Sequence, residues 1–196
     1  MKEKGFFINV SEEIFFKLLH AAYCERVGLI VGTSKPAEEL CKRFCAWLFG
    51  RRQHNSLFIQ GGVGTGKTTL VESIFSAVKQ ASEAGIEHNF YAMIKATALE
   101  NKDRLEEGLV DYLTDLKGLI IDDMGSEEPT VKVWGSEIRP MERVLKGRSD
   151  KMLPTILTTN LNLQQIESQY NSKRLADVLA QYDKLVIDTT KSFRRI

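Results

Sequence analysis

The sequence contains the run Gly61-Gly62-Val63-Gly64-Thr65-Gly66-Lys67-Thr68, which matches the pattern G-x-x-x-x-G-K-[ST] of a phosphate-binding P-loop. Glycines let the backbone curl tightly, so that several N–H groups point at one anion. Lys67 can place a positive charge at the β- and γ-phosphates, and the Thr68 hydroxyl can join the oxygen ligands of Mg²⁺. The run therefore predicts a site for a triphosphate and its metal ion.

The segments on both sides of this run strengthen the prediction. Leu57-Phe58-Ile59 is a short apolar run typical of a buried parallel strand. After the run, apolar residues recur at helical spacing, at Leu70, Ile74, Val78 and Ala81. A helix that begins there adds a favourable dipole for phosphate. The alternative, a glycine-rich turn with a chance lysine, explains neither the eight matching positions nor the two flanks.

The composition sets broad limits. A chain of 196 residues, 43% of them hydrophobic, indicates one domain with an appendage and a sizeable core. The net charge of +1 gives no overall electrostatic signature of nucleic-acid binding. Three cysteines, Cys24, Cys41 and Cys45, are interpreted as buried hydrophobic residues rather than metal ligands. With no signal peptide and no membrane-spanning run, we expect a reduced, cytoplasmic protein.

Residues 1–50 are expected to form a helical leader before an ATP-binding domain over residues 51–196. Ser11 can cap a first helix whose first turn carries Glu12 and Glu13. A break at residues 32–36 separates it from a second helix, with Leu40, Phe44, Trp47 and Leu48 facing inward. The second helix is expected to pack on the domain. The first either packs there too or docks a partner.

From Leu57 onward, strands alternate with helices, which predicts an α/β fold with a parallel five-stranded sheet flanked by helices. The expected strands are Leu57–Gln60, Asn89–Ile94, Gly118–Asp122, Thr155–Thr158 and Leu185–Asp188. The expected helices are Lys67–Ala84, Arg104–Leu113, Val131–Lys146, Leu163–Tyr170 and Lys173–Gln181, and Asn162 with Gln165 forms a candidate capping box. Pro140 is expected to split or kink the Val131–Lys146 helix, or to begin its second half.

Two carboxylates follow the apolar run Leu119-Ile120-Ile121. Ligands of open parallel sheets bind at the carboxyl ends of the strands. Asp122 is therefore expected to hold Mg²⁺, directly or through water, and Asp123 to orient or deprotonate the attacking water. Asp123 is shorter than the glutamate of many fast ATPases, so we expect slow hydrolysis. The alternative is an acidic turn into Met124-Gly125, which the P-loop upstream disfavours.

A third polar strand end follows in Pro154-Thr155-Ile156-Leu157-Thr158-Thr159-Asn160. The Asn160 amide can hold the attacking water or contact the γ-phosphate, and so sense whether that phosphate is present. The alternative is an asparagine that caps the next turn. We favour the sensing role, because this strand is the next after Asp122 and is expected beside the P-loop strand.

These three elements, in this order, resemble the AAA+ ATPases, and more closely the DnaC-type helicase loaders and the IstB-type helper ATPases. Four segments carry the resemblance. They are the P-loop from Gly61 to Thr69, the strings Asp122-Asp123-Met124-Gly125 and Thr158-Thr159-Asn160-Leu161, and the ending Lys191-Ser192-Phe193-Arg194. It covers the chain from Leu57 onward. About 35 residues follow Asn160, too few for the helical lid of many AAA+ proteins, so the resemblance implies a core without a full lid.

The resemblance implies an ATP-dependent homo-oligomer in which an arginine of one subunit completes its neighbour's site. It implies that Arg194 reads the nucleotide near the γ-phosphate. The family has a further arginine at the position of Val178, and Arg174, one helical turn earlier, is the candidate replacement. The basic stretch Arg139, Arg143, Lys146, Arg148 and Lys151 either contacts a DNA backbone or is a solvated helix face, and we favour the solvated face.

The resemblance thus predicts an ATP- and Mg²⁺-binding, slowly hydrolysing switch protein that loads a replicative helicase, with single-stranded DNA as a possible further partner. An IstB-like helper of a transposase or recombinase is the close alternative. A small-molecule P-loop kinase is a second alternative. It predicts an arginine-rich lid after the core, and no such stretch is visible in the sequence. The third is an ATP-gated interaction module without turnover, which Asp123 and Val178 leave open.

Overall fold

The computed structural model describes residues 5–50 and 52–187. Its main sheet contains β1 (Leu57–Gly61), β2 (Ala92–Lys95), β3 (Leu119–Met124), β6 (Thr155–Thr159) and β7 (Asp183–Ile187). A separate two-stranded hairpin contains β4 (Val131–Val133) and β5 (Ser136–Ile138). The helices are α1 (Glu12–Val27), α2 (Lys35–Phe49), α3 (Lys67–Glu83), α4 (Lys102–Glu106), α5 (Leu109–Asp115), α6 (Pro140–Asp150), α7 (Leu163–Tyr170) and α8 (Lys173–Ala180), and η1 (Ala96–Glu100) is a 3₁₀ helix.

The main sheet is parallel and has the strand order β2-β3-β6-β1-β7. The prediction of a five-stranded parallel sheet with helices on its faces is therefore confirmed. The strand that ends near Asn160 lies between β1 and β3, beside the P-loop strand as the sequence suggested. As a result, the carboxyl ends of β1, β3 and β6 meet at one edge of the sheet.

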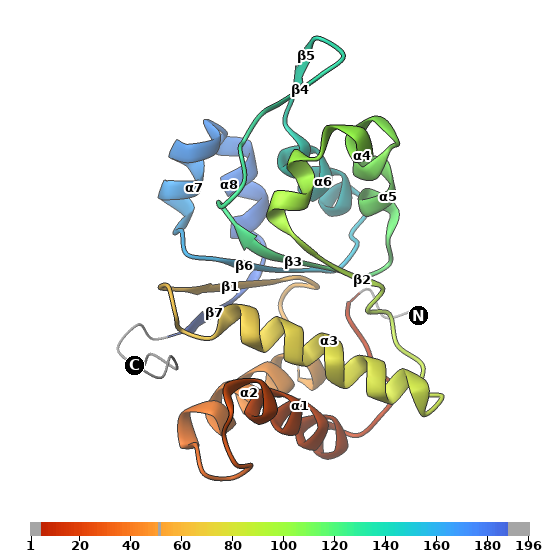
Figure 1. Cartoon of the computed structure of the whole chain (residues 1–196), viewed down its shortest axis with the longest axis vertical. Helices are drawn as coiled ribbons and strands as arrows, with labels where there is room; N and C mark the ends of the chain where they lie inside the picture. The colour runs from red at the N-terminus through yellow and green to blue at the C-terminus, as the bar shows by residue number, and fades with distance from the viewer. Residues whose placement is uncertain (1–4, 51, 188–196) are drawn as a thin grey trace.

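Side-chain alternation along the strands divides the core into two layers. Leu57 and Ile59 of β1 face a cluster with α1, α2 and α3, whereas Phe58 faces a cluster with α5, α6, α7 and α8. Figure 1 shows these two groups of helices on opposite faces of the sheet. Both leader helices therefore pack on the core: α1 contacts α3 and α2, and α2 also contacts β7. Within the described residues, no helix is long and apolar enough to cross a membrane.

Helix boundaries follow local capping signals. The Ser11 hydroxyl accepts a hydrogen bond from the Ile14 N–H at the start of α1, and Asn162 and Gln165 form the expected capping box of α7. The expected helix Arg104–Leu113 is instead two short helices, α4 and α5. Gly108 separates them with φ 89°, in the left-handed region that glycine adopts without steric penalty.

The expected helix Val131–Lys146 is wrong in its first half. Residues 131–138 form the β4–β5 hairpin, and α6 begins at Pro140, which is the first-turn position that proline favours. The alternating buried and exposed residues of β4 and a glycine in its turn are strand signals. Figure 1 shows the hairpin projecting away from the body of the molecule.

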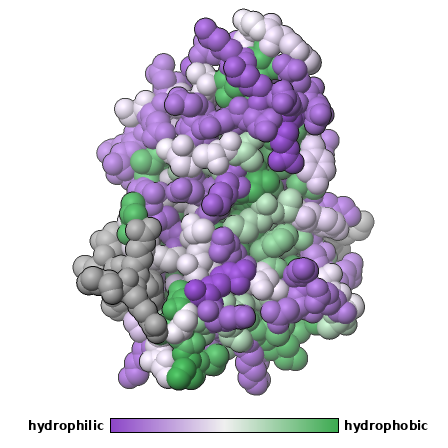
Figure 2. Space-filling model, viewed as in Figure 1, coloured by the Kyte–Doolittle hydropathy of each residue, from purple (hydrophilic) through white to green (hydrophobic). Residues whose placement is uncertain are grey.

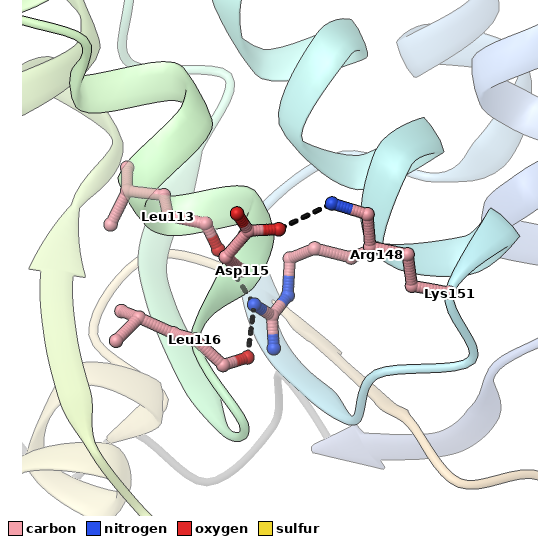
Figure 3. A network of polar contacts seen from close by, with 5 residues as sticks. All are labelled: Leu113, Asp115, Leu116, Arg148 and Lys151. Atoms are coloured by element: carbon pink, nitrogen blue, oxygen red, sulfur yellow. Dashed lines mark hydrogen bonds and ion pairs between the residues drawn. The ribbon is translucent and has the colours of Figure 1, made fainter.

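The prediction of a solvated basic face on α6 is wrong for Arg148, which is fully buried. Its guanidinium donates hydrogen bonds to the carbonyl oxygens of Leu113, Leu116 and Pro154 and to the Thr155 hydroxyl. Figure 3 shows Arg148 reaching to α5 beside the separate Lys151–Asp115 ion pair. Burial lowers the pKa of Arg148 to about 10, so the side chain stays charged at neutral pH.

The three cysteines are buried free thiols, in agreement with the sequence interpretation. In the part of the chain that the structure describes, no group of three or more His, Cys, Asp or Glu side chains is placed to hold a metal ion.

Candidate functional site

The P-loop connects the end of β1 to the first residue of α3. Gly64 and Gly66 have φ 80° and 88°, so the loop uses the left-handed backbone that its glycines allow. A Cβ on Gly61 would lie 2.7 Å from the Thr65 Oγ1 and 3.0 Å from the Ile187 carbonyl oxygen, so no larger residue fits there without movement. Gly66 caps α3 without a side-chain hydrogen bond, which leaves the first N–H groups of this helix free of a side-chain acceptor.

Lys67 is almost fully buried at the base of this loop. Its Nζ donates hydrogen bonds to the carbonyl oxygens of Gly61 and Gly62, both at 2.8 Å, and to the Asn160 Oδ1 at 2.5 Å. Burial lowers the pKa of Lys67, and the nearby carboxylates of Asp123 and Asp122 oppose that shift. The structure thus brings the P-loop lysine and the candidate sensor asparagine, 93 positions apart in sequence, into direct contact.

Asp122 lies at the buried end of β3, with 1% of its surface exposed. Its Oδ1 accepts a hydrogen bond from the Thr158 hydroxyl at 2.6 Å and another from the Thr68 hydroxyl at 3.2 Å. The two residues that the sequence assigned to Mg²⁺, Thr68 and Asp122, are therefore direct neighbours. A hydroxyl and a carboxylate are the oxygen ligands that Mg²⁺ uses together with phosphate and water, so this pair fits the ion.

Asp123 has φ 63°, a left-handed conformation that aspartate and asparagine tolerate better than longer or branched residues. The pairing of β3 with β6 shifts register between Ile121 and Met124, so that Asp123 lies at an irregularity of the strand. The Asn160 Nδ2 lies 3.5 Å from the Asp123 Oδ1, at the long limit of a hydrogen bond. Asn160 thus lies between the Lys67 ammonium and the Asp123 carboxylate.

Thr158 is a site residue to which the sequence analysis assigned no role. Its hydroxyl donates to Asp122 and accepts a hydrogen bond from the Asp123 N–H at 2.8 Å, so one buried oxygen orients both carboxylate residues. The next hydroxyl, that of Thr159, donates to the Met124 carbonyl oxygen at 2.7 Å. These contacts depend on the register of β6 against β3, which a single sequence does not reveal.

Replacing Thr158 with valine is expected to lower the free energy of unfolding by about 1–3 kcal/mol. Valine keeps the branched shape but leaves the partly buried Asp123 N–H without its acceptor and the buried Asp122 carboxylate without its shortest donor. Urea denaturation measures the change, and Thr158→Ser is the matched control because it keeps the hydroxyl. Equal losses for both variants would contradict this role of the hydroxyl.

Of the two predicted arginines, the structure describes only Arg174, and it does not bring Arg174 to this site. Arg174 is exposed near the start of α8, and within the described residues no hydrogen bond or ion pair connects it to the P-loop. Val178 is half-buried on the same helix and packs against the core cluster on the α5–α8 face of the sheet. Arg194 and the Lys191–Arg194 ending lie outside the described residues.

Solved structures of known proteins share this architecture. DnaI matches with a TM-score of 0.56 and 20% identity, over 94% of this chain and 94% of that chain. The DnaC helicase loader matches with a TM-score of 0.57 and 18% identity, over 79% of this chain and 92% of that chain. The chain has the AAA+ P-loop fold.

A further AAA+ structure adds a bound nucleotide to the comparison. The replication initiator DnaA, solved with AMPPCP and single-stranded DNA, matches with a TM-score of 0.52 and 21% identity, over 85% of this chain and 50% of that chain. No protein-family model matches the sequence, and no curated protein sequence matches it. At these identities, the likeness establishes the AAA+ fold.

Proposed function

We propose that this protein binds ATP with Mg²⁺, hydrolyses it slowly and acts as a nucleotide-dependent switch that helps to load a helicase in DNA replication. One observation carries the proposal. One end of the sheet brings together Lys67 and Thr68 at the start of α3, Asp122 of β3, and Asn160, which directly follows β6. This is the end at which open parallel sheets bind their ligands. The fold likeness to DnaI and the DnaC helicase loader supports the loading role.

Each residue has a distinct proposed role. The P-loop N–H groups of residues 61–69 and the Lys67 ammonium bind the phosphates, and Thr68 and Asp122 hold Mg²⁺. Mg²⁺, when bound, would offset negative charge on the phosphates. Asp123 positions the attacking water. Asn160 senses the γ-phosphate by donating a hydrogen bond from its Nδ2, while its Oδ1 accepts from Lys67.

The proposal includes contacts beyond the chain itself. A replicative helicase is the proposed protein partner, with single-stranded DNA as a further ligand. In an ATP-dependent homo-oligomer, the exposed Arg174 would be available to a neighbouring subunit's nucleotide, and Arg194 would read the γ-phosphate. Capture of partners by a tagged protein, with and without ATP, tests this part, and recovery of a transposase instead of a helicase would favour the IstB-like role.

Replacing Asp123 with asparagine is expected to preserve ATP binding and to reduce phosphate release at least about tenfold, because a positioned general base typically contributes more than that. Asparagine tolerates the left-handed backbone at this position, so the fold should be retained. Phosphate release is measured with and without single-stranded DNA, and ATP binding by calorimetry. If the unmodified protein binds ATP but releases no phosphate under either condition, the chain is a binding switch rather than an ATPase.

A further inference from the structure

The tip of the β4–β5 hairpin exposes a tryptophan. Val133 pairs with Ser136, so Trp134 and Gly135 form a two-residue turn. Both have positive φ, 47° and 77°, which is the type I′ geometry of tight hairpins. Trp134 is 78% exposed, the most exposed of the large hydrophobic residues in the described part of the chain. Figure 2 shows mostly hydrophilic side chains around this projecting end of the molecule.

Folding does not explain a tryptophan at this position. Type I′ turns favour asparagine, aspartate or glycine at the first central residue, and a bulky residue with positive φ is strained. An aromatic side chain offsets such a cost when it is buried, but Trp134 is not buried. A strained and exposed aromatic residue is typical of a contact surface, and tryptophan is the residue type most enriched among the dominant contacts of protein interfaces.

The same chain carries an open groove of about 670 Å³ at the other end of the strands. Its lining includes Lys117, which precedes β3, and Leu153 and Pro154, which precede β6. The hairpin, in contrast, follows the carboxyl end of β3. Tyr91 is 50% exposed in this groove, the Lys117 Nζ lies 5.9 Å from the centre of its ring, and the His88 ring centre lies 6.4 Å from it.

We propose that Trp134 of one copy of this chain inserts into the Tyr91–Lys117 groove of a second copy. The groove is larger than an indole ring needs, within the roughly 300–1,000 Å³ typical of ligand pockets. Tyr91 and His88 offer aromatic faces, and Lys117 offers a cation, for which tryptophan is the best aromatic partner. The exposed Trp134 side chain, called the knob below, is therefore small enough to enter the groove and chemically suited to its lining.

Charge on the hairpin favours a protein partner over nucleic acid. Lys132 and Glu137 lie directly opposite each other on the two strands, so the stem of the hairpin carries no net charge. Stacking of nucleic-acid bases on an aromatic residue is normally accompanied by cations that follow the phosphates. A neutral stem with an aromatic tip suits a hydrophobic groove instead.

The knob and the groove are different surfaces, so the contact is head-to-tail. Such contacts produce closed rings or open chains, depending on the rotation between copies. Neither surface contains a nucleotide-site residue, and the contact is therefore independent of ATP. Its failure leaves the proposed nucleotide binding intact. Likewise, loss of ATP binding in Lys67→Ala is expected to leave this contact unchanged.

The test measures self-association by sedimentation over a range of concentrations, without nucleotide and after nuclease treatment. Trp134→Asn is expected to weaken association at least about tenfold, as for a dominant interface residue. This variant creates the Asn-Gly turn that type I′ geometry prefers, so unfolding cannot explain the loss. Tyr91→Ala should weaken association similarly. Tyr112→Ala removes another exposed aromatic residue, outside the knob and the groove, and should change nothing.

Mixing the two variants provides a second readout. Trp134→Asn retains its groove and Tyr91→Ala retains its knob, so an equal mixture should form heterodimers but nothing larger. Several results would overturn the proposal: an unmodified protein that stays monomeric, association unchanged in Trp134→Asn, or association lost in Trp134→Asn but kept in Tyr91→Ala. Association that disappears after nuclease treatment would assign Trp134 to nucleic acid instead.

Discussion

The Lys67→Ala variant is expected to lose measurable ATP binding, with an affinity at least about 100-fold weaker than that of the unmodified protein. The lysine is the cation at the base of the P-loop, and a charge-assisted hydrogen bond to phosphate in a buried site is worth about 1.5–3 kcal/mol or more. Its ammonium is held by the Gly61 and Gly62 carbonyl oxygens and by Asn160, so it is already positioned at the loop. Isothermal titration calorimetry with ATP and Mg²⁺ measures the loss.

Folding must be separated from binding in this experiment. Removing Lys67 takes a donor away from three oxygen acceptors, although the Gly62 carbonyl oxygen keeps the Thr65 hydroxyl. The variant's secondary structure and denaturation midpoint are therefore compared with those of the unmodified protein. Lys79→Ala is the matched control, because Lys79 is an exposed lysine on the same helix α3. An unchanged ATP affinity in a folded Lys67→Ala protein would refute the nucleotide site.

The parts of the site that could be predicted are those that depend on local sequence. The P-loop pattern fixes a strand, a loop and a helix within about ten residues, and the structure shows β1, the glycine turn and α3 in those positions. Asp122 and Asn160 follow apolar strands, and parallel strands bring their carboxyl ends to one edge. Their proximity to Lys67 therefore follows from chain order and strand polarity together.

The β4–β5 hairpin was missed because its turn lacks the usual signal. Asn-Gly between alternating residues is the strongest short hairpin pattern, whereas Trp134-Gly135 is not typical of type I′ turns. The sequence from Val131 to Lys146 also contains apolar residues at spacings compatible with a helix. Pro140 marked the true beginning of α6, and the correct interpretation was to begin the helix there.

The roles of Thr158 and Arg148 were missed for a different reason. Each depends on contacts between residues distant in sequence: Thr158 bonds to Asp122, 36 positions away, and Arg148 bonds to the Leu113 carbonyl oxygen, 35 positions away. A single sequence shows only that Arg148 follows other basic residues on a helix. Its burial is decided by the packing of α5, α6 and β6.

Replacing Arg148 with alanine is expected to lower the free energy of unfolding by about 3–5 kcal/mol, enough to unfold much of the protein at moderate temperature. The guanidinium supplies four hydrogen bonds, three of them to main-chain carbonyl oxygens that end α5 and precede β6. Without it, those acceptors stay buried beside a cavity the size of the lost side chain. Urea denaturation and thermal melting both measure the change.

Two further variants separate hydrogen bonding from packing. Arg148→Met fills much of the same volume but donates nothing, so it should recover the packing contribution. It should still lose about 2–3 kcal/mol for the carbonyl oxygens of Leu113 and Leu116, which lose their guanidinium donor. Arg143→Ala removes an exposed arginine from the same helix and should change stability by no more than about 0.5 kcal/mol. A methionine variant as stable as the unmodified protein would show that Arg148 acts by volume alone. In that case, the hydrogen bonds from Arg148 to α5 that Figure 3 shows would contribute nothing net to stability.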